Sequence, residues 1–198
     1  MPDPPPEKQD EAVSPWWPAG SWVGPAALGQ ALCAALDDVA GSWLLAQPDE
    51  GIAGAALASI VLNAAALDDH TDIDGLEAVF DGALSGDERP ARIISLVWDS
   101  WIGRGSAGRG TARSAAAVGL ARNWALRLAP TGTTVNTIAL PSGFPNGAPP
   151  SAAPVPVATG IDDLAHVVRF FGDPDNDYVI GQVISLGGGD FVWSNHSL

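Results

Sequence analysis

The chain has 198 residues, enough for one domain with a substantial core, and carries 23 acidic against 9 basic side chains. Its formal net charge of −14 argues against nucleic acids and anionic membrane surfaces as partners, since both select clustered Lys and Arg. Hydrophobic residues make up 46% of the chain, but no apolar run approaches the ~18 uninterrupted residues of a membrane span. We therefore expect one globular domain that binds neither nucleic acid nor membrane.

The first 20 residues are typical of a tail rather than of a folded domain. They begin MPDPPPEKQDEA, which is acidic and proline-rich and lacks the basic-then-apolar pattern of an export signal. The single cysteine, Cys33, excludes an internal disulfide and fits a reducing compartment. We expect a disordered tail over 1–20, one domain over 21–198 and a cytoplasmic location.

Short apolar strands alternate with helical segments over the rest of the chain. Strands are expected at 42–46, 60–65 and 92–97, helices at 73–84, 111–129 and 161–171, and one further strand after each of the last two helices. This alternation is the order that builds a parallel sheet covered by helices on both faces. The 3 histidines are scattered and Cys33 stands alone, so no metal site is expected.

Two segments carry a family pattern: residues 110–143, GTARSAAAVGLARNWALRLAPTGTTVNTIALPSG, and residues 161–189, IDDLAHVVRFFGDPDNDYVIGQVISLGGG. The matching positions are Gly119-Leu120, Ala129-Pro130, Gly132 and Val135-Asn136 in the first segment, and Gly181-Gln182 and Gly187-Gly188 in the second. The chain resembles the short-chain dehydrogenase/reductase family. The resemblance implies an α/β fold, a Rossmann-like doubly wound parallel sheet in a single domain, abbreviated relative to the family. It also places Tyr178 where the last strand begins, which implies a packing role for this residue.

The residues that perform the chemistry in that family have no counterpart here. The resemblance aligns Gly110 with the family's catalytic tyrosine, Ser114 with its lysine and Val97 with its serine. No other register restores the pair, because Tyr178 is the only tyrosine and Lys8 the only lysine. In the family the tyrosine exchanges a proton as hydride moves, and the lysine cation lowers the tyrosine's pKa. Losing a general acid costs about 10²–10⁴-fold in rate, so the resemblance implies no catalysis unless a nearby Asp or His serves instead.

Two tryptophans, Trp98 and Trp101, stand where the family's substrate cleft would open. One interpretation is that bulky indoles fill a vacated cleft or form a contact surface. The other is that Trp98 is an ordinary packed residue. The sequence supports both equally.

The family's phosphate-binding turn, T-G-x-x-x-G-I-G-x-A, is matched less closely. Laying residues 22–36 on this pattern puts Gly29 at the last glycine, with Val23 and Ala27 at the first two. Glycines in this turn let the backbone approach the cofactor's pyrophosphate at a helix N-terminus. Side chains at 23 and 27 should obstruct that approach. We therefore expect no cofactor, with NAD or NADP as the alternative.

Two further positions are candidates for cofactor contacts through the resemblance. Asp49 follows the strand expected at 42–46, where the family has an acidic residue for the adenosine ribose. Asn63 matches the second asparagine of the family's N-N-A-G segment. Too few residues separate these strands for the strand and helix that normally intervene, so one βα unit is expected to be missing.

The segments that form subunit interfaces in that family match best. These are the helices expected at 73–84, 111–129 and 161–171 and the final strand, with Ala116, Leu120, Trp124 and Phe170 as interface candidates. We therefore expect a catalytically inactive subunit that pairs with an active short-chain reductase of the ketoacyl or hydroxyacyl type, in a hetero-oligomer or homo-oligomer. Two alternatives stay open: an NAD(P)-dependent oxidoreductase with an atypical site, and a homodimeric ligand-binding or scaffold protein.

Overall fold

The computed structural model describes residues 20–23, 26–36, 44–46, 59–63, 77, 81, 91–102, 109–141, 143–145 and 158–188. Within them, one sheet has the strand order β2-β1-β3-β4-β5-β6, and every neighbouring pair is parallel. The strands are β1 Gly20–Val23, β2 Leu44–Ala46, β3 Ser59–Asn63, β4 Arg92–Trp98, β5 Thr134–Leu140 and β6 Val183–Ser185. The predicted doubly wound parallel sheet is confirmed.

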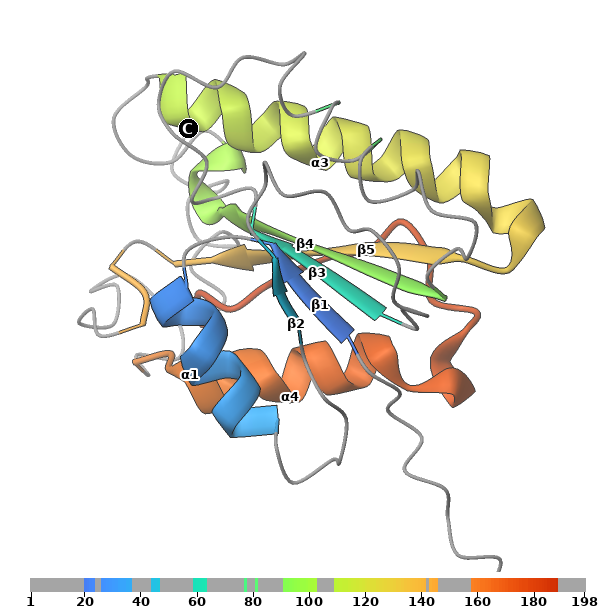
Figure 1. The fold of residues 1–198 in the computed structure, drawn as a ribbon. Helices are drawn as coiled ribbons and strands as arrows, with labels where there is room; N and C mark the ends of the chain where they lie inside the picture. Colours follow the sequence, from blue (N-terminus) through green and yellow to red (C-terminus); the bar gives the residue numbers. More distant parts are fainter. Residues whose placement is uncertain are drawn as a thin grey trace, which may run out of the picture.

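Helices cover both faces of this sheet. They are α1 Ala26–Leu36, α3 Arg109–Leu128 and α4 Ile161–Gly172, with short 3-10 turns η3 Asp99–Ile102, η4 Ala129–Thr131 and η5 Pro174–Asn176. Figure 1 shows α3 across one face and α1 and α4 together on the other. Glu77 and Asp81, the two described residues of the helix expected at 73–84, are helical.

The central strands β4 and β5 form the middle of the core. A parallel strand that is covered on both faces reads as a nearly continuous apolar run, and every residue of β5 is buried. On the α1/α4 side, the core contains the following buried side chains: Leu32, Leu36, Ile94, Leu96, Ile138, Leu140, Phe144, Leu164, Val168 and Phe171. On the α3 side, Val97 and Ala139 pack with Ala117 and Val118. The alanines of α3 let the helix lie close to the sheet.

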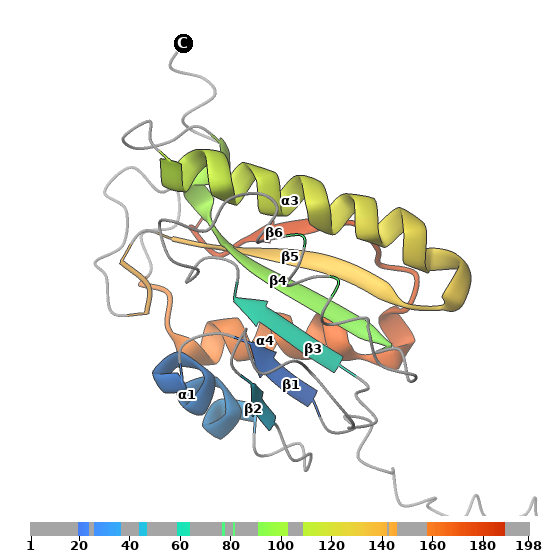
Figure 2. The same ribbon diagram turned by 45° about the horizontal axis from the view of Figure 1, so that its top comes forward.

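The fold is shortened on one side, as expected. In the common doubly wound order, three strands lie on one side of the point where the strand order reverses. Here that point lies between β1 and β3, and β2 is the only described strand beyond β1. Figure 2 shows the short strands β1 and β2 beside α1, away from the long pair β4 and β5.

Two expectations about the chain, one near its start and one before its last strand, need correction. β1 begins at Gly20, one residue before the start predicted for the domain. The packing role expected for Tyr178 is wrong, because this side chain is 76% exposed just before the last strand.

None of the helices that the structure describes is long and apolar enough to cross a membrane. The cytoplasmic location stays a prediction.

Candidate functional site

The carboxyl ends of the parallel strands share one edge of the sheet. β1 ends at Val23, β3 at Asn63, β4 at Trp98 and β5 at Leu140. Doubly wound folds bind their ligands outside this edge, at the crevice where the strand order reverses. In this chain the strand order reverses between β1 and β3, so the crevice is expected there.

Helix α1 begins at this crevice. Its first residue, Ala26, follows β1 after only Gly24 and Pro25, which lie outside the described residues. The first turn of a helix leaves backbone N–H groups unpaired and carries the positive end of the dipole, so it is suited to bind a pyrophosphate. The described first turn of α1 contains no acidic side chain that would repel such a group.

The position of β1 corrects the register predicted for the phosphate turn. Val23, expected in the turn, is a strand residue that pairs with Ala46 and Leu62. Ala27 and Gly29, expected at the second and last glycines, both lie inside α1. The obstruction predicted from Val23 therefore does not arise, because this residue belongs to the sheet ladder.

The two other cofactor candidates have different outcomes. Asn63 is the last residue of β3, paired with Leu96 of β4, and so lies at the carboxyl edge beside the crevice. Asp49 lies outside the described residues. Both assignments stay predictions.

The sequence resemblance aligns Gly110, Ser114 and Val97 with the family's catalytic residues, and the structure places all three in regular elements. Gly110 is the second residue of α3 and has no side chain. Ser114, one turn later, is only 5% exposed, and an aliphatic hydroxyl is not an acid near pH 7. Val97 is fully covered and packs against Ala117 on the α3 side of the sheet. Ser114 and Val97 are thus buried side chains, and the alignment of the three residues with catalytic positions stays a prediction.

One carboxylate that the sequence analysis did not single out lies beside these positions. Asp99 directly follows β4 and begins η3, which packs against α3. The residue is half-buried and is engaged in an interaction. Its position in the sequence could have identified it, because Asp99 directly follows an apolar strand and precedes the helix that contains Gly110 and Ser114.

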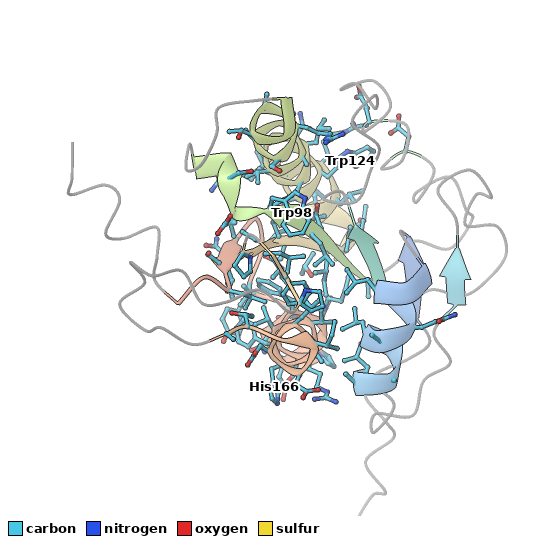
Figure 3. All side chains as sticks on the ribbon, turned by 90° about the vertical axis from the view of Figure 1, so that its left-hand side faces the viewer. Trp98, Trp124 and His166 are labelled. Atoms are coloured by element: carbon cyan, nitrogen blue, oxygen red, sulfur yellow. The ribbon has the colours of Figure 1, made fainter. Side chains whose placement is uncertain are left out.

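Trp98 behaves as a packed residue. It is half-buried and packs against the core on the α1/α4 side. Figure 3 looks at the carboxyl edge and shows Trp98 between the layers of α3 and α4, with His166 on the outer side of α4. No group of three potential metal ligands occurs among the described residues.

The four interface candidates differ in accessibility. Ala116 and Leu120 are half-buried and pack toward the sheet. Trp124 is buried, and the Arg127 guanidinium lies over its ring at 4.4 Å from the centroid. Phe170 on α4 is 43% exposed. Of the four, only Phe170 has an exposed side chain. The spacing of apolar residues along α3 therefore did not predict which of its side chains are exposed.

The outer face of α3 contains a large apolar side chain that the sequence analysis did not select. Leu126 is 80% exposed. Ala112, Ala115 and Gly119 are exposed on earlier turns of the same helix. The exposed face of α3 therefore contains Leu126, whereas Trp124 lies on its buried face.

Several short-chain dehydrogenases and reductases have solved structures similar to this chain. A 3-α-hydroxysteroid dehydrogenase from Pseudomonas, complexed with NADH, matches with a TM-score of 0.64 and 15% identity over 91% of this chain and 99% of its own. A variant of a Serratia marcescens short-chain dehydrogenase/reductase matches at 0.66 and 18% identity, over 89% and 98%. BdcA in complex with NADPH matches at 0.62 and 18% identity, over 86% and 93%. No family model and no curated protein matches the sequence.

The chain therefore has the fold of the short-chain dehydrogenase/reductases, as its sequence predicted. The expectation that it has no cofactor is wrong: structures with this fold hold NADH in one case and NADPH in another. That expectation rested on Val23 and Ala27 as turn residues, and Val23 lies in the sheet while Ala27 lies in α1.

Proposed function

We propose that this protein is a short-chain dehydrogenase/reductase-fold subunit that binds a nicotinamide dinucleotide, performs no reduction itself and assembles with an active short-chain reductase. One observation carries the proposal. Helix α3 and strands β4 and β5 are present, while the sequence resemblance aligns Gly110, Ser114 and Val97 with the family's tyrosine, lysine and serine.

The nucleotide would be held by backbone rather than by charged side chains. The first turn of α1 meets the pyrophosphate through N–H groups and the helix dipole. Asn63, at the end of β3, lies at the same carboxyl edge of the sheet and is suited to hydrogen-bond a polar part of the cofactor. When bound, a nicotinamide supplies a hydride. Gly110 and Ser114 provide no group that could donate the accompanying proton, so hydride transfer to a carbonyl is not supported here.

Two exposed apolar side chains support an assembly. Leu126 lies on the outer face of α3 and Phe170 on the outer face of α4, on opposite sides of the sheet. Each could lie at the centre of an interface on its own side of the sheet, where a partner would cover it. A partner of ketoacyl- or hydroxyacyl-reductase type would supply the proton-transferring residues, and this chain would stabilise the assembly.

The test is to isolate the native complex, identify the partner and measure carbonyl reduction by each protein alone and by both together. We expect the isolated chain to show no NADH- or NADPH-dependent reduction. We expect the partner to be a short-chain reductase whose kcat/KM or thermal stability rises when this chain is added. Reduction by the isolated chain, with no reductase associated, would contradict the proposal.

The second candidate is an oxidoreductase with an atypical acid, and Asp99 is the observation that favours it. This half-buried carboxyl group begins η3, against the helix that carries the family's tyrosine position. If the isolated chain reduces a carbonyl compound, Asp99→Asn should abolish that activity while NADH binding persists. Activity that survives Asp99→Asn would exclude this candidate.

A further inference from the structure

Charge is distributed very unevenly along this acidic chain. The sequence contains 23 acidic residues, and none of them lies between residues 100 and 161. The same stretch contains 5 of the 9 basic residues, all of them arginines. It includes α3, whose 20 residues contain 4 arginines and no carboxylate. Helix α3 is therefore a basic element in a protein whose formal net charge is −14.

Four exposed residues in the second half of this helix form what we call the basic face of α3: Arg122, Asn123, Leu126 and Arg127. Residues four apart are neighbours on a helix surface, so Arg122 lies one turn before Leu126. Leu126 is 80% exposed and is one of three large apolar side chains that are exposed among the described residues. The basic face thus combines an apolar side chain with two guanidinium groups, on the outer side of the layer that α3 forms in Figure 1.

Arg122 has no carboxylate partner within its own helix. On an exposed helix, an acidic residue three or four positions away can pair with an arginine. The residues at these positions are Val118, Gly119, Ala125 and Leu126. A guanidinium keeps its charge at any physiological pH. Helix α3 therefore presents a permanent positive charge that it does not neutralise itself.

Arg127 is positioned by an aromatic ring. Its guanidinium lies over the ring of the buried Trp124, 4.4 Å from the centroid. Stacking on the face of a ring leaves the N–H groups at the edge of the guanidinium directed away from the ring, where they can bind a carboxylate. Because the stacking restricts the side chain, less conformational entropy is lost when it binds. Arg127 is thus a preorganised donor at an exposed position.

A second copy of the chain is poorly suited to cover this face through its own α3. A two-fold interface brings the same surface patch of both subunits together. Arg122 and Arg127 of one copy would then lie against the same two arginines of the other, and like charges across an interface are unfavourable. A complementary surface needs carboxylates beside an apolar group instead.

We propose that the basic face of α3 binds an acidic surface of a partner protein, with an apolar side chain against Leu126 and carboxylates against Arg122 and Arg127. The partner chemistry rests on the proposed assembly and deepens it, because it states what the reductase must present to this chain. Charge complementarity accelerates encounter and discriminates against surfaces of the wrong sign. The same arginines therefore favour a hetero-complex over a dimer formed through α3.

An acidic helical peptide tests the basic face without the reductase. The probe has about three heptads, with leucine at positions a and d and glutamate at the flanking positions e and g. The neutral probe has glutamine in place of each glutamate. Fluorescence anisotropy of the labelled probes measures binding at an ionic strength of about 0.15 M, where charges more than about 8 Å away are screened. We expect the parent chain to bind the acidic probe about tenfold more tightly than the neutral one.

Two variants of equal net charge locate the effect. Arg122→Gln removes a positive charge from the basic face. Gln30→Glu changes the net charge by the same amount at an exposed position of α1, on the other side of the sheet. We expect Arg122→Gln to weaken binding of the acidic probe about threefold or more and to leave the neutral probe unaffected. Gln30→Glu should leave the affinity for both probes unchanged, and Arg122→Lys should retain most of the preference for the acidic probe.

Three results would overturn the proposal. The first is equal affinity of the parent chain for the two probes. The second is an equal loss of binding in Arg122→Gln and Gln30→Glu, because net charge alone would then explain it. The third is self-association of the parent chain in sedimentation velocity that Arg122→Gln abolishes, because a second copy would then occupy the face.

Failure of the proposed function gives a different result. If the native complex contains no reductase while the acidic probe binds as expected, the basic face keeps its assignment and the reductase is excluded as its partner. If the reductase associates but Arg122→Gln binds both the reductase and the acidic probe as tightly as the parent chain, the assembly stands and the role of the basic face is excluded.

Discussion

Asn136 and Gln182 are joined through a buried side chain rather than through a strand ladder alone. The Asn136 Oδ1 accepts the backbone N–H of Gln182 at 3.0 Å, and its Nδ2 donates to the carbonyl oxygen of Val179 at 2.9 Å. The backbone of the next residue, Thr137, donates to the Gln182 carbonyl oxygen at 2.8 Å. One carboxamide of β5 thus fixes the segment that leads into β6. This accounts physically for the Val135-Asn136 pair that marked the family pattern.

Asn136→Ala should be strongly destabilising. The substitution removes two partly buried hydrogen bonds, those that Asn136 makes with the Gln182 N–H and the Val179 carbonyl oxygen, which costs about 1–3 kcal/mol in the free energy of unfolding. Asn176→Ala is the control of the same residue type, because the Asn176 side chain bonds the Phe170 carbonyl oxygen at an exposed position. Chemical denaturation of both variants checks this expectation. Equal losses in the two would contradict the role given to Asn136.

Two glycines should respond to alanine with opposite signs. Gly181 has φ +69°, where an L side chain is strained, and an added Cβ would lie 3.7 Å from the Ala125 side chain. Gly181→Ala should therefore destabilise by about 1 kcal/mol. Gly119 lies inside α3, and an added Cβ would meet nothing within 4 Å. Gly119→Ala should stabilise by about 0.5–1 kcal/mol, since glycine weakens a helix interior. Unfolding curves that change in the same direction would refute the expectation.

Ser95 should tolerate loss of its hydroxyl. The Oγ of this fully buried β4 residue has no hydrogen-bond partner among the described residues. Ser95→Ala should therefore leave the free energy of unfolding unchanged or raise it slightly. Thr159→Ala is the matched comparison, because the Thr159 hydroxyl donates to the Leu186 carbonyl oxygen at 2.6 Å, and its loss should cost about 1 kcal/mol. A larger loss for Ser95→Ala than for Thr159→Ala would show that Ser95 has a partner.

Leu126→Glu tests the proposed assembly. Because Leu126 is 80% exposed, the substitution should change the stability of the isolated chain by less than about 0.5 kcal/mol. A carboxylate in an apolar interface should nevertheless abolish association with the reductase. Gln30→Glu introduces the same side chain on the exposed part of α1, away from α3, and should leave association intact. Size-exclusion chromatography of mixtures with the reductase measures complex formation. A complex that still forms with Leu126→Glu would exclude this face as the interface.

The sheet and its covering helices could be predicted because each strand and helix is indicated by the pattern of apolar residues within its own segment. The apolar run of β4 indicates a strand that is buried on both faces, and the amphipathic pattern of α4 indicates a helix with one buried face. The first turn was misassigned because Gly29 was read as a turn glycine, although a helix also accommodates glycine in its interior. The outer face of α3 was misassigned for another reason. Alanine and leucine occur all round this helix, so its period does not show that Trp124 is buried and Leu126 exposed.

Calorimetric titration with NADH and NADPH tests the central claim most directly, using the parent chain, Ala27→Glu and Ala34→Glu. A carboxylate in the first turn of α1 interacts favourably with the helix dipole and should stabilise the helix by about 0.3–1 kcal/mol. The same carboxylate repels a pyrophosphate bound there, and two close charges interact by about 1–4 kcal/mol. Ala34 is exposed near the other end of α1. We predict saturable binding to the parent and to Ala34→Glu, and binding roughly tenfold weaker or more for Ala27→Glu without loss of stability. The absence of binding to the parent chain, or equal binding to all three proteins, would contradict the account.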